Sequence, residues 1–278
     1  YAARAALHMW EEPCISGDHG SGAVFFSGCT LRCIFCQNSE IAAAQVGKKI
    51  TVERLCDIFL ELQDKCANNI NLVTATHFVP QVAEALVKAK NKGLVIPVVY
   101  NSSAYENVST LNMLDGLVDV YLPDMKYIDS RLSAEYSKAP DYADVAKAAI
   151  HEMVRQTGKP EFFIVDDELV KSGRVEAGIM KKGVIVRHLV LPGTTKDSKA
   201  VIKYLIDTYG DDIYISIMSQ YTPFERLKKH PLLSRKVTRK EYNSVVDYAI
   251  DCGINNGFIQ EGDVAEESFI PEFDYEGI

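Results

Sequence analysis

Three cysteines, Cys29, Cys33 and Cys36, lie within eight residues of one another in the run CTLRCIFC. Thiolates are the usual protein ligands of iron–sulfur clusters, and three of them on one short loop can hold three irons of a four-iron cubane. The fourth iron then lacks a protein ligand and is open to another molecule. The alternative is structural zinc, which needs a fourth Cys or His at short spacing. None follows Cys36 at short spacing, because the next residues are Gln37, Asn38, Ser39 and Glu40, and no His lies between His19 and His77, so the loop favours the cluster.

The other four of the seven cysteines lack metal-ligand spacing; they are Cys14, Cys56, Cys66 and Cys252. An odd number of cysteines with this scatter argues against the disulfide framework of a secreted protein. No apolar run approaches the roughly 20 residues that a membrane span needs. The amino end, YAARAALHMWEEP, also lacks the long apolar centre of a signal peptide. We therefore expect a cytoplasmic enzyme that does not contact a membrane.

Strands and helices alternate along the predicted fold that positions the cysteine loop. Near-continuous apolar runs indicate six parallel strands buried on both faces, at residues 23–28, 70–76, 95–101, 118–126, 183–193 and 213–220. Helical patterns lie between them, at residues 51–65, 79–93, 104–116, 143–158 and 198–210. Six β/α units fall short of the eight that close a TIM barrel. We predict an α/β fold, a partial (β/α)6 TIM-like barrel.

The chain divides into three predicted regions. Residues 1–22 are expected to form an N-terminal helix and lead-in, residues 23–252 the partial barrel, and residues 253–278 an acidic C-terminal tail. Within the barrel, residues 161–180 alternate apolar and polar side chains and predict an inserted β-hairpin.

The charge distribution limits the classes of partner. The formal net charge is −8, but residues 261–278 carry seven acids and no Lys or Arg, so the rest of the chain is close to neutral. Nucleic-acid binding needs a basic surface that this chain lacks. We interpret the acidic tail as a solvated or loosely packed end. The seven Lys and Arg residues between 226 and 240 are either a solvated face or a docking site for an acidic electron donor.

The spacing C-x3-C-x2-C directly after the first strand of a β/α barrel resembles the signature of the radical S-adenosylmethionine superfamily. That resemblance implies one 4Fe-4S cluster whose open iron binds S-adenosylmethionine, and reductive cleavage of this cofactor to a 5'-deoxyadenosyl radical. Over nearly all its length the chain is most similar to homologues of pyruvate formate-lyase activating enzyme, and residues 16–29 resemble their lead-in and first strand. The eight-cysteine insert of some activases is absent from the sequence, so we expect no second cluster.

The resemblance also implies residues that contact S-adenosylmethionine. Phe35 matches an aromatic position whose backbone meets the adenine. Asp124 and Lys126 match an Asp-x-Lys pair beside the cofactor, although a salt bridge at the strand end explains the same two residues. Arg187 matches a basic residue in an apolar strand. Burial of a lone Arg is costly, so it needs an anionic partner, either the cofactor carboxylate or Asp124.

Three strand ends depart from the family pattern. The second strand lacks the Gly-Gly-Glu motif of the activases and ends in Thr74, Thr76 and His77. The two hydroxyls can accept a hydrogen bond from the cofactor's ammonium group but carry no charge. For His77 the sequence leaves three roles equally open: a cofactor contact, an acid or base, or a structural histidine. Asn101 and Gln220 replace the family's residues at the third and sixth strand ends and complete the candidate binding set. No catalytic residue is assigned.

The sequence leaves three functions open. The first is a radical enzyme that abstracts a hydrogen atom, with a glycyl radical enzyme as its protein substrate. The second is radical modification of a small molecule or another macromolecule. The third is an iron–sulfur electron carrier or sensor, which is disfavoured because a carrier needs four protein ligands. We expect a monomer that receives electrons from a flavodoxin or ferredoxin.

Overall fold

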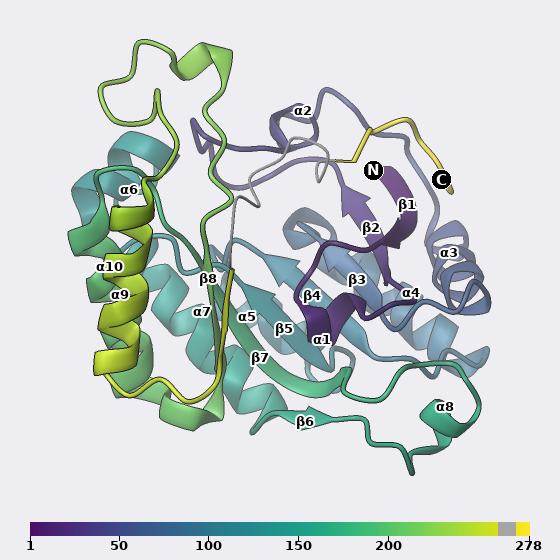
Figure 1. The fold of residues 1–278 in the computed structure, drawn as a ribbon. Helices are drawn as coiled ribbons and strands as arrows, with labels where there is room; N and C mark the ends of the chain where they lie inside the picture. The colour runs from purple at the N-terminus through teal and green to yellow at the C-terminus, as the bar shows by residue number, and fades with distance from the viewer. Residues whose placement is uncertain (261–270) are drawn as a thin grey trace.

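The computed structural model describes residues 1–260 and 271–278. In these residues nine strands form one sheet in the order β1-β2-β3-β4-β5-β7-β8-β9, with β6 paired to the start of β7. Six parallel strands match the six predicted ones: β2 (Ser21–Phe26), β3 (Ile70–Val73), β4 (Val98–Ser102), β5 (Val120–Pro123), β7 (Met180–Leu189) and β8 (Tyr214–Met218). The predicted partial barrel is therefore confirmed (Figure 1).

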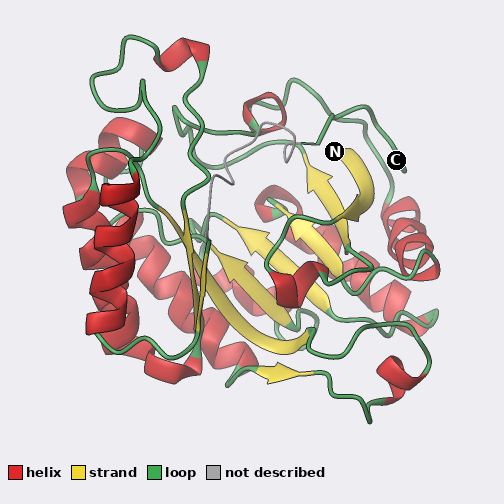
Figure 2. Cartoon of the chain, viewed as in Figure 1, coloured by secondary structure: helices red, strands yellow, loops and turns green. Residues whose placement is uncertain are grey.

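Long helices alternate with these strands and cover the outer side of the curved sheet (Figure 2). They are α3 (Val52–Asp64), α4 (Val79–Asn91), α7 (Tyr142–Thr157), α9 (Thr195–Tyr209) and α10 (Arg239–Asp251). The helix predicted at residues 104–116 is only one turn, α5 (Val108–Leu111), followed by the 3-10 turn Asn112–Leu114. α6 (Ser130–Ser137) and α10 were not predicted. No helix in the described part of the chain is long and apolar enough to cross a membrane.

Both faces of the sheet are buried, which explains the near-continuous apolar strands. The outer face packs against the helices through side chains such as Leu72, Tyr100 and Tyr121. On the inner face, α1 (Pro13–Ser16) inserts its apolar residues among side chains of β4, β5 and β7 (Figure 1). The contacting residues are Cys14, Ile15, Val99, Val120, Leu122 and Ile185. α1 thus covers part of the inner face.

The prediction of an N-terminal helix is wrong for the first residues. Residues 2–8 form β1 (Ala2–His8), an edge strand antiparallel to β2. Its small side chains are mostly buried, and the open edge of β2 supplies hydrogen-bond partners that a helix cannot use. Local helical propensity, high for alanine, is a weak preference that such tertiary contacts override.

The C-terminal tail also differs from our interpretation. β9 (Gly257–Ile259) extends the sheet parallel to β8. Residues 271–278 lie along the outer edge of β1, where the Ala5 amide donates to the Glu276 carbonyl at 2.8 Å and the Tyr275 amide donates to the Ala3 carbonyl at 3.2 Å. The Arg4 guanidinium pairs with the carboxylates of Asp274, at 2.6 Å, and Glu276. The acids between 261 and 270 lie outside the described residues.

The insert at residues 161–180 is only partly a hairpin. β6 (Glu161–Phe162) pairs antiparallel with β7, but the connection between them contains the helical turn α8 (Glu168–Lys171). The insert is attached to the lead-in by Glu176, whose carboxylate accepts hydrogen bonds from the backbone amides of Asp18 at 2.8 Å and His19 at 2.5 Å. Beyond β6 the pairing continues through Phe163, whose amide donates to the Ile179 carbonyl at 2.9 Å and whose carbonyl accepts from the Gly178 amide at 2.8 Å.

We predict that Thr238→Ala lowers the free energy of unfolding by about 1 kcal/mol, because it removes the N-cap of α10. The Thr238 side chain accepts from the Glu241 amide, and the Glu241 carboxylate accepts from the Thr238 amide, which is a complete capping box. Urea denaturation measures the change. Asn243→Ala, on the exposed side of the same helix, is the control and should be neutral or slightly stabilising. Equal midpoints for both variants would contradict the prediction.

Candidate functional site

A cavity of about 270 Å³ lies at the carboxyl ends of the parallel strands. Strands that run in the same direction end at the same edge of the barrel, so residues far apart in sequence meet there. Ten of the twelve predicted site residues line the cavity: Cys29, Cys33, Phe35, Cys36, Thr74, Asn101, Asp124, Lys126, Arg187 and Gln220. The other two, Thr76 and His77, do not line it.

The cysteine loop follows β2 and is held by hydrogen bonds to its backbone. Gly28 enters the loop at a φ of 102°, in the left-handed region that favours glycine. The Arg32 guanidinium donates to the Cys29 carbonyl at 2.6 Å. From the segment after β8, the Arg226 guanidinium donates to the carbonyls of Ile34 at 3.1 Å and Cys36 at 2.8 Å. Arg226, the first cation of the basic stretch, therefore contributes to the shape of the loop.

Three thiols on one cavity wall fit the donor set of a cluster with one open iron. Burial and then the neighbouring thiols raise the pKa of Cys36 to about 11, and burial also raises the pKa of Cys29. Iron binding must therefore displace protons from these thiols. In residues 1–260 and 271–278, no three His, Cys, Asp or Glu side chains already have the geometry of a bound metal site.

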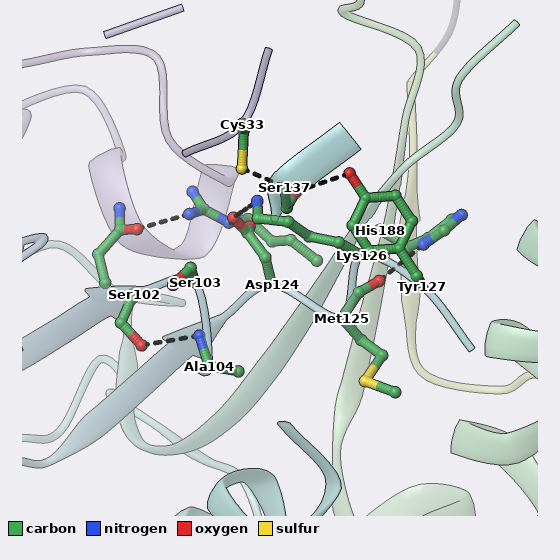
Figure 3. A network of polar contacts seen from close by, with 12 residues as sticks. Cys33, Ser102, Ser103, Ala104, Asp124, Met125, Lys126, Tyr127, Ser137 and His188 are labelled. Atoms are coloured by element: carbon green, nitrogen blue, oxygen red, sulfur yellow. Dashed lines mark hydrogen bonds and ion pairs between the residues drawn. The ribbon is translucent and has the colours of Figure 1, made fainter. Parts of the chain in front are cut away.

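A network of charged side chains lies beside Cys33 (Figure 3). The Asp124 carboxylate is 2.6 Å from Lys126 Nζ and 3.1 Å from Arg187 Nε. Arg187 also donates to Asn101 Oδ1 at 2.5 Å and to Glu11 Oε2 at 3.1 Å. Burial pushes the pKa of Asp124 upward, but the charges of Lys126 and Arg187 outweigh it and hold this pKa below its usual value. In this structure Asp124 and Lys126 therefore form the salt bridge that the sequence analysis gave as the alternative to a cofactor contact.

Glu11 is a site residue that the sequence analysis missed. It lies between β1 and α1, lines the cavity, and accepts hydrogen bonds from the side-chain amides of Asn71 at 3.1 Å and Asn101 at 3.2 Å. Arg187 therefore has two anionic partners, Glu11 and Asp124. Glu11 follows no predicted parallel strand, so no strand-end pattern marks it. The available signal was the acidic pair before Pro13 in a lead-in that is otherwise mostly apolar.

Thr74 lies at the end of β3 with a φ of 59°, a left-handed conformation that is rare outside glycine. Its amide donates to the Asn101 carbonyl at 2.9 Å, which fixes the turn against the end of β4. Such conformations cost about 1 to 3 kcal/mol and concentrate at functional sites. The strain occurs at the strand end where the sequence departs from the activases.

Thr76 and His77 lie in the 3-10 turn that follows Thr74 and do not line the cavity, so their predicted contacts with the cofactor stay predictions. Thr76 donates at 2.6 Å to the carboxylate of Glu106, a buried side chain whose pKa is raised to about 7 by burial. His77 is exposed, with its ring edge-on to Phe78.

Phe35 and Gln220 join the cysteine loop to neighbouring elements. The Phe35 ring is buried, with centroids 6.5 Å from those of Tyr127, Tyr136 and Tyr221. The Gln220 carbonyl accepts from the side-chain amide of Gln37 at 3.1 Å, which connects the end of β8 to the loop. Both residues therefore have a packing or bridging function in addition to any cofactor contact.

Residues 16–138, which include the three cysteines, match the protein family described as a 4Fe-4S single cluster domain. Over 256 residues the chain is 27% identical to the uncharacterized protein MJ0674 of Methanocaldococcus jannaschii, covering 90% of this chain and 67% of the relative. SuiB from Streptococcus suis, in a structure bound to S-adenosylmethionine, superposes with a TM-score of 0.55 and 14% identity over 86% of this chain and 49% of SuiB.

HydG, a maturase of the [FeFe]-hydrogenase, gives a TM-score of 0.52 and 14% identity over 87% of this chain and 52% of HydG. The chain shares its fold with SuiB and HydG. It spans about half the length of the two solved structures. The family match over the cysteine loop agrees with the predicted 4Fe-4S cluster.

We predict that Asp124→Asn lowers the free energy of unfolding by about 2 to 3 kcal/mol, because Arg187 and Lys126 lose their shared buried anion. Chemical denaturation measures the loss. The control is Asp115→Asn, which breaks the exposed pair with Arg155 and should cost less than about 1 kcal/mol. Unchanged stability with weakened S-adenosylmethionine binding would contradict the salt bridge and favour the cofactor contact.

His188 gives a second prediction, on pH dependence. Its Nδ1 is 2.8 Å from the Met125 carbonyl, and its Nε2 is buried without a partner among the described residues (Figure 3). Burial lowers the pKa of His188 to about 4 from its ordinary 6.5. Between these values the unfolded chain binds a proton that the folded chain does not, so stability falls as pH falls.

Acidification from pH 6.5 to 4 should therefore remove about 2 to 3 kcal/mol through His188. The variant His188→Asn keeps a donor for the Met125 carbonyl but cannot bind this proton. Its free energy of unfolding should therefore change less steeply with pH. Denaturation at a series of pH values measures the slope, with His151→Gln on the exposed side of α7 as the control. A His188→Asn slope equal to that of the control would show the prediction to be wrong.

Proposed function

We propose that this chain cleaves S-adenosylmethionine reductively and uses the resulting radical to abstract a hydrogen atom from a substrate. The observation that carries this proposal is the shared cavity, which contains the three thiols of a single-cluster domain and a network of polar groups at the strand ends. The fold shared with SuiB and HydG supports it.

When bound, the reduced 4Fe-4S cluster supplies the electron that cleaves the sulfonium of S-adenosylmethionine to a 5'-deoxyadenosyl radical. The residues of the chain bind the cluster and exclude water from the cavity. Cys29, Cys33 and Cys36 hold three irons. The apolar side chains on the cavity wall exclude water from the reacting groups; they include Phe25, Phe26, Leu31, Leu189 and Leu191.

The polar cavity residues are the candidates to orient S-adenosylmethionine. Asp124 and Lys126 contribute a carboxylate and an ammonium group, which suit ribose hydroxyls and an anionic group. Thr74 and Gln220 add neutral hydrogen-bonding groups. Arg187 already donates from all three guanidinium nitrogens, to Asp124, Glu11 and Asn101, so we assign it a positioning function.

For the substrate, we propose a glycine of a glycyl radical enzyme, on the basis of the motif resemblance to the activases. The alternative is a small molecule or another macromolecule, favoured by the altered strand ends at Thr74, Asn101 and Gln220. An electron carrier would need a fourth protein ligand, which the loop does not contain.

A flavodoxin or ferredoxin is the proposed electron donor. Its suggested docking site is the basic stretch at residues 226–240, in which at least three of the seven cations have partners in the structure. Arg226 holds the cysteine loop, Lys228 pairs with Glu225, and Arg235 pairs with Glu241. The acids of these pairs lower the net positive charge that steers an acidic donor, and salt screens the remainder.

We predict that changing Cys29, Cys33 or Cys36 to Ala abolishes the cluster, since each supplies one of three thiolate ligands. Anaerobic reconstitution of the unchanged chain should give about four irons per chain, with the absorption of an oxygen-sensitive cluster. Cys14→Ala and Cys252→Ala are matched controls and should keep the iron, because both lie away from the cavity. A colourless, zinc-loaded protein would exclude this assignment.

The function itself is tested by incubating the reduced, reconstituted protein with S-adenosylmethionine and measuring 5'-deoxyadenosine. We expect product from the unchanged chain and none from the three cysteine variants. Adding a candidate glycyl radical enzyme should produce a glycyl radical in the electron paramagnetic resonance spectrum. Cofactor cleavage without that radical would favour the alternative substrates, and no cleavage at all would reject the proposal.

A further inference from the structure

The end of α6 lies directly against the cysteine loop. The Ile34 amide donates to the Tyr136 carbonyl at 2.8 Å, and the Arg32 amide donates to the Ser137 carbonyl at 3.3 Å. The last carbonyls of a helix lack partners within the helix, so these amides satisfy them. Two residues that flank Cys33 are thus fixed to the end of α6.

The side chain of Ser137 adds a third connection, this time to a cluster ligand. Its Oγ is 3.0 Å from Cys33 Sγ and 3.0 Å from the hydroxyl of Tyr127 (Figure 3). Both Ser137 and Tyr127 have only 1% of their surface exposed. Among the described residues, Cys33 is the one cysteine of the loop whose sulfur contacts a side-chain hydroxyl. These contacts form a continuous buried path from Tyr127 to the thiol.

The chemistry of a cluster ligand fixes the direction of both hydrogen bonds. A cysteine that binds iron is a thiolate and has no proton to donate, so the Ser137 hydroxyl must donate to Cys33 Sγ. A serine hydroxyl has one proton, so the Tyr127 hydroxyl must donate to Ser137 Oγ. We propose that Tyr127 and Ser137 form a hydroxyl relay that stabilises the Cys33 thiolate and raises the reduction potential of the cluster.

This proposal deepens the proposed function and rests on its cluster. Hydrogen bonds to the sulfurs are one of the factors that set the potential of an iron–sulfur cluster, because they stabilise the more negative, reduced form. Burial makes the interaction stronger, since no water competes for the sulfur. Ser137 and Tyr127 are therefore positioning residues that act through Cys33.

The test compares Ser137→Ala with Ser133→Ala in the reconstituted full chain. Ser133 lies on the same helix, is also buried, and donates to the Ser130 carbonyl at 3.1 Å rather than to the loop. Midpoint potentials are measured by a redox titration followed by electron paramagnetic resonance. We expect Ser137→Ala to lower the ratio of reduced to oxidised cluster about tenfold at a fixed potential, or about 59 mV for one electron. Ser133→Ala should leave it unchanged.

Two further measurements separate the relay from simple support of the loop. Tyr127→Phe keeps the ring and Ser137 but removes the outer hydroxyl, and should shift the potential in the same direction by a smaller amount. In resonance Raman spectra, the Fe–S stretch should shift between H2O and D2O in the unchanged chain, and this shift should weaken in Ser137→Ala.

Wild-type-like potentials in both Ser137→Ala and Tyr127→Phe would overturn the relay while leaving the cluster intact. Wild-type protein that binds no iron after reconstitution would overturn both the relay and the proposed function. A Ser137→Ala chain that loses iron without a change in the potential of the remaining cluster would show that Ser137 only supports the loop, which also overturns the relay.

Discussion

The positive charge of Arg187, near the carboxyl end of the mostly buried strand β7, is the constraint around which the site is arranged. A buried charge is costly unless it is paired and hydrogen-bonded. Here the partners come from three other elements: Asp124 after β5, Asn101 in β4, and Glu11 before α1. Because all of these groups must converge on one guanidinium, the strand ends that form the cavity are held in fixed relative positions.

The need to pair the charge of Arg187 also explains why a segment from the edge of the sheet reaches the cavity. β1 is an antiparallel strand at the margin of the sheet, yet the segment that leaves it carries Glu11 to Arg187 and α1 to the inner face. Apolar packing of Cys14 and Ile15 fixes the path of this segment, and the ion pair fixes its charged end. Burial and charge pairing therefore act together on a few consecutive residues.

The sequence was sufficient for the six parallel strands, which follow from local pattern, but not for every helix, since α6 and α10 were not predicted. Continuous apolar runs identified the six parallel strands, and the shared direction of those strands placed Cys33, Asp124 and Arg187 in one cavity. Features that depend on long-range pairing were not predicted. β1 and β9 form only because a neighbouring edge is available, and Glu11 reaches the site through a lead-in without strand periodicity. The sequence also does not show that Thr74 adopts a left-handed conformation, after which Thr76 and His77 do not line the cavity.

The segment at residues 271–278 has a consequence for the solution behaviour of the molecule. An unpaired strand edge is a template for pairing with another chain, and β1 would present such an edge. The backbone contacts of Tyr275 and Glu276, together with the ion pairs of Arg4, occupy it. Pro271 at the start of the same segment lines the cavity. Protection against self-association and part of the cavity wall are therefore combined in one short stretch of chain.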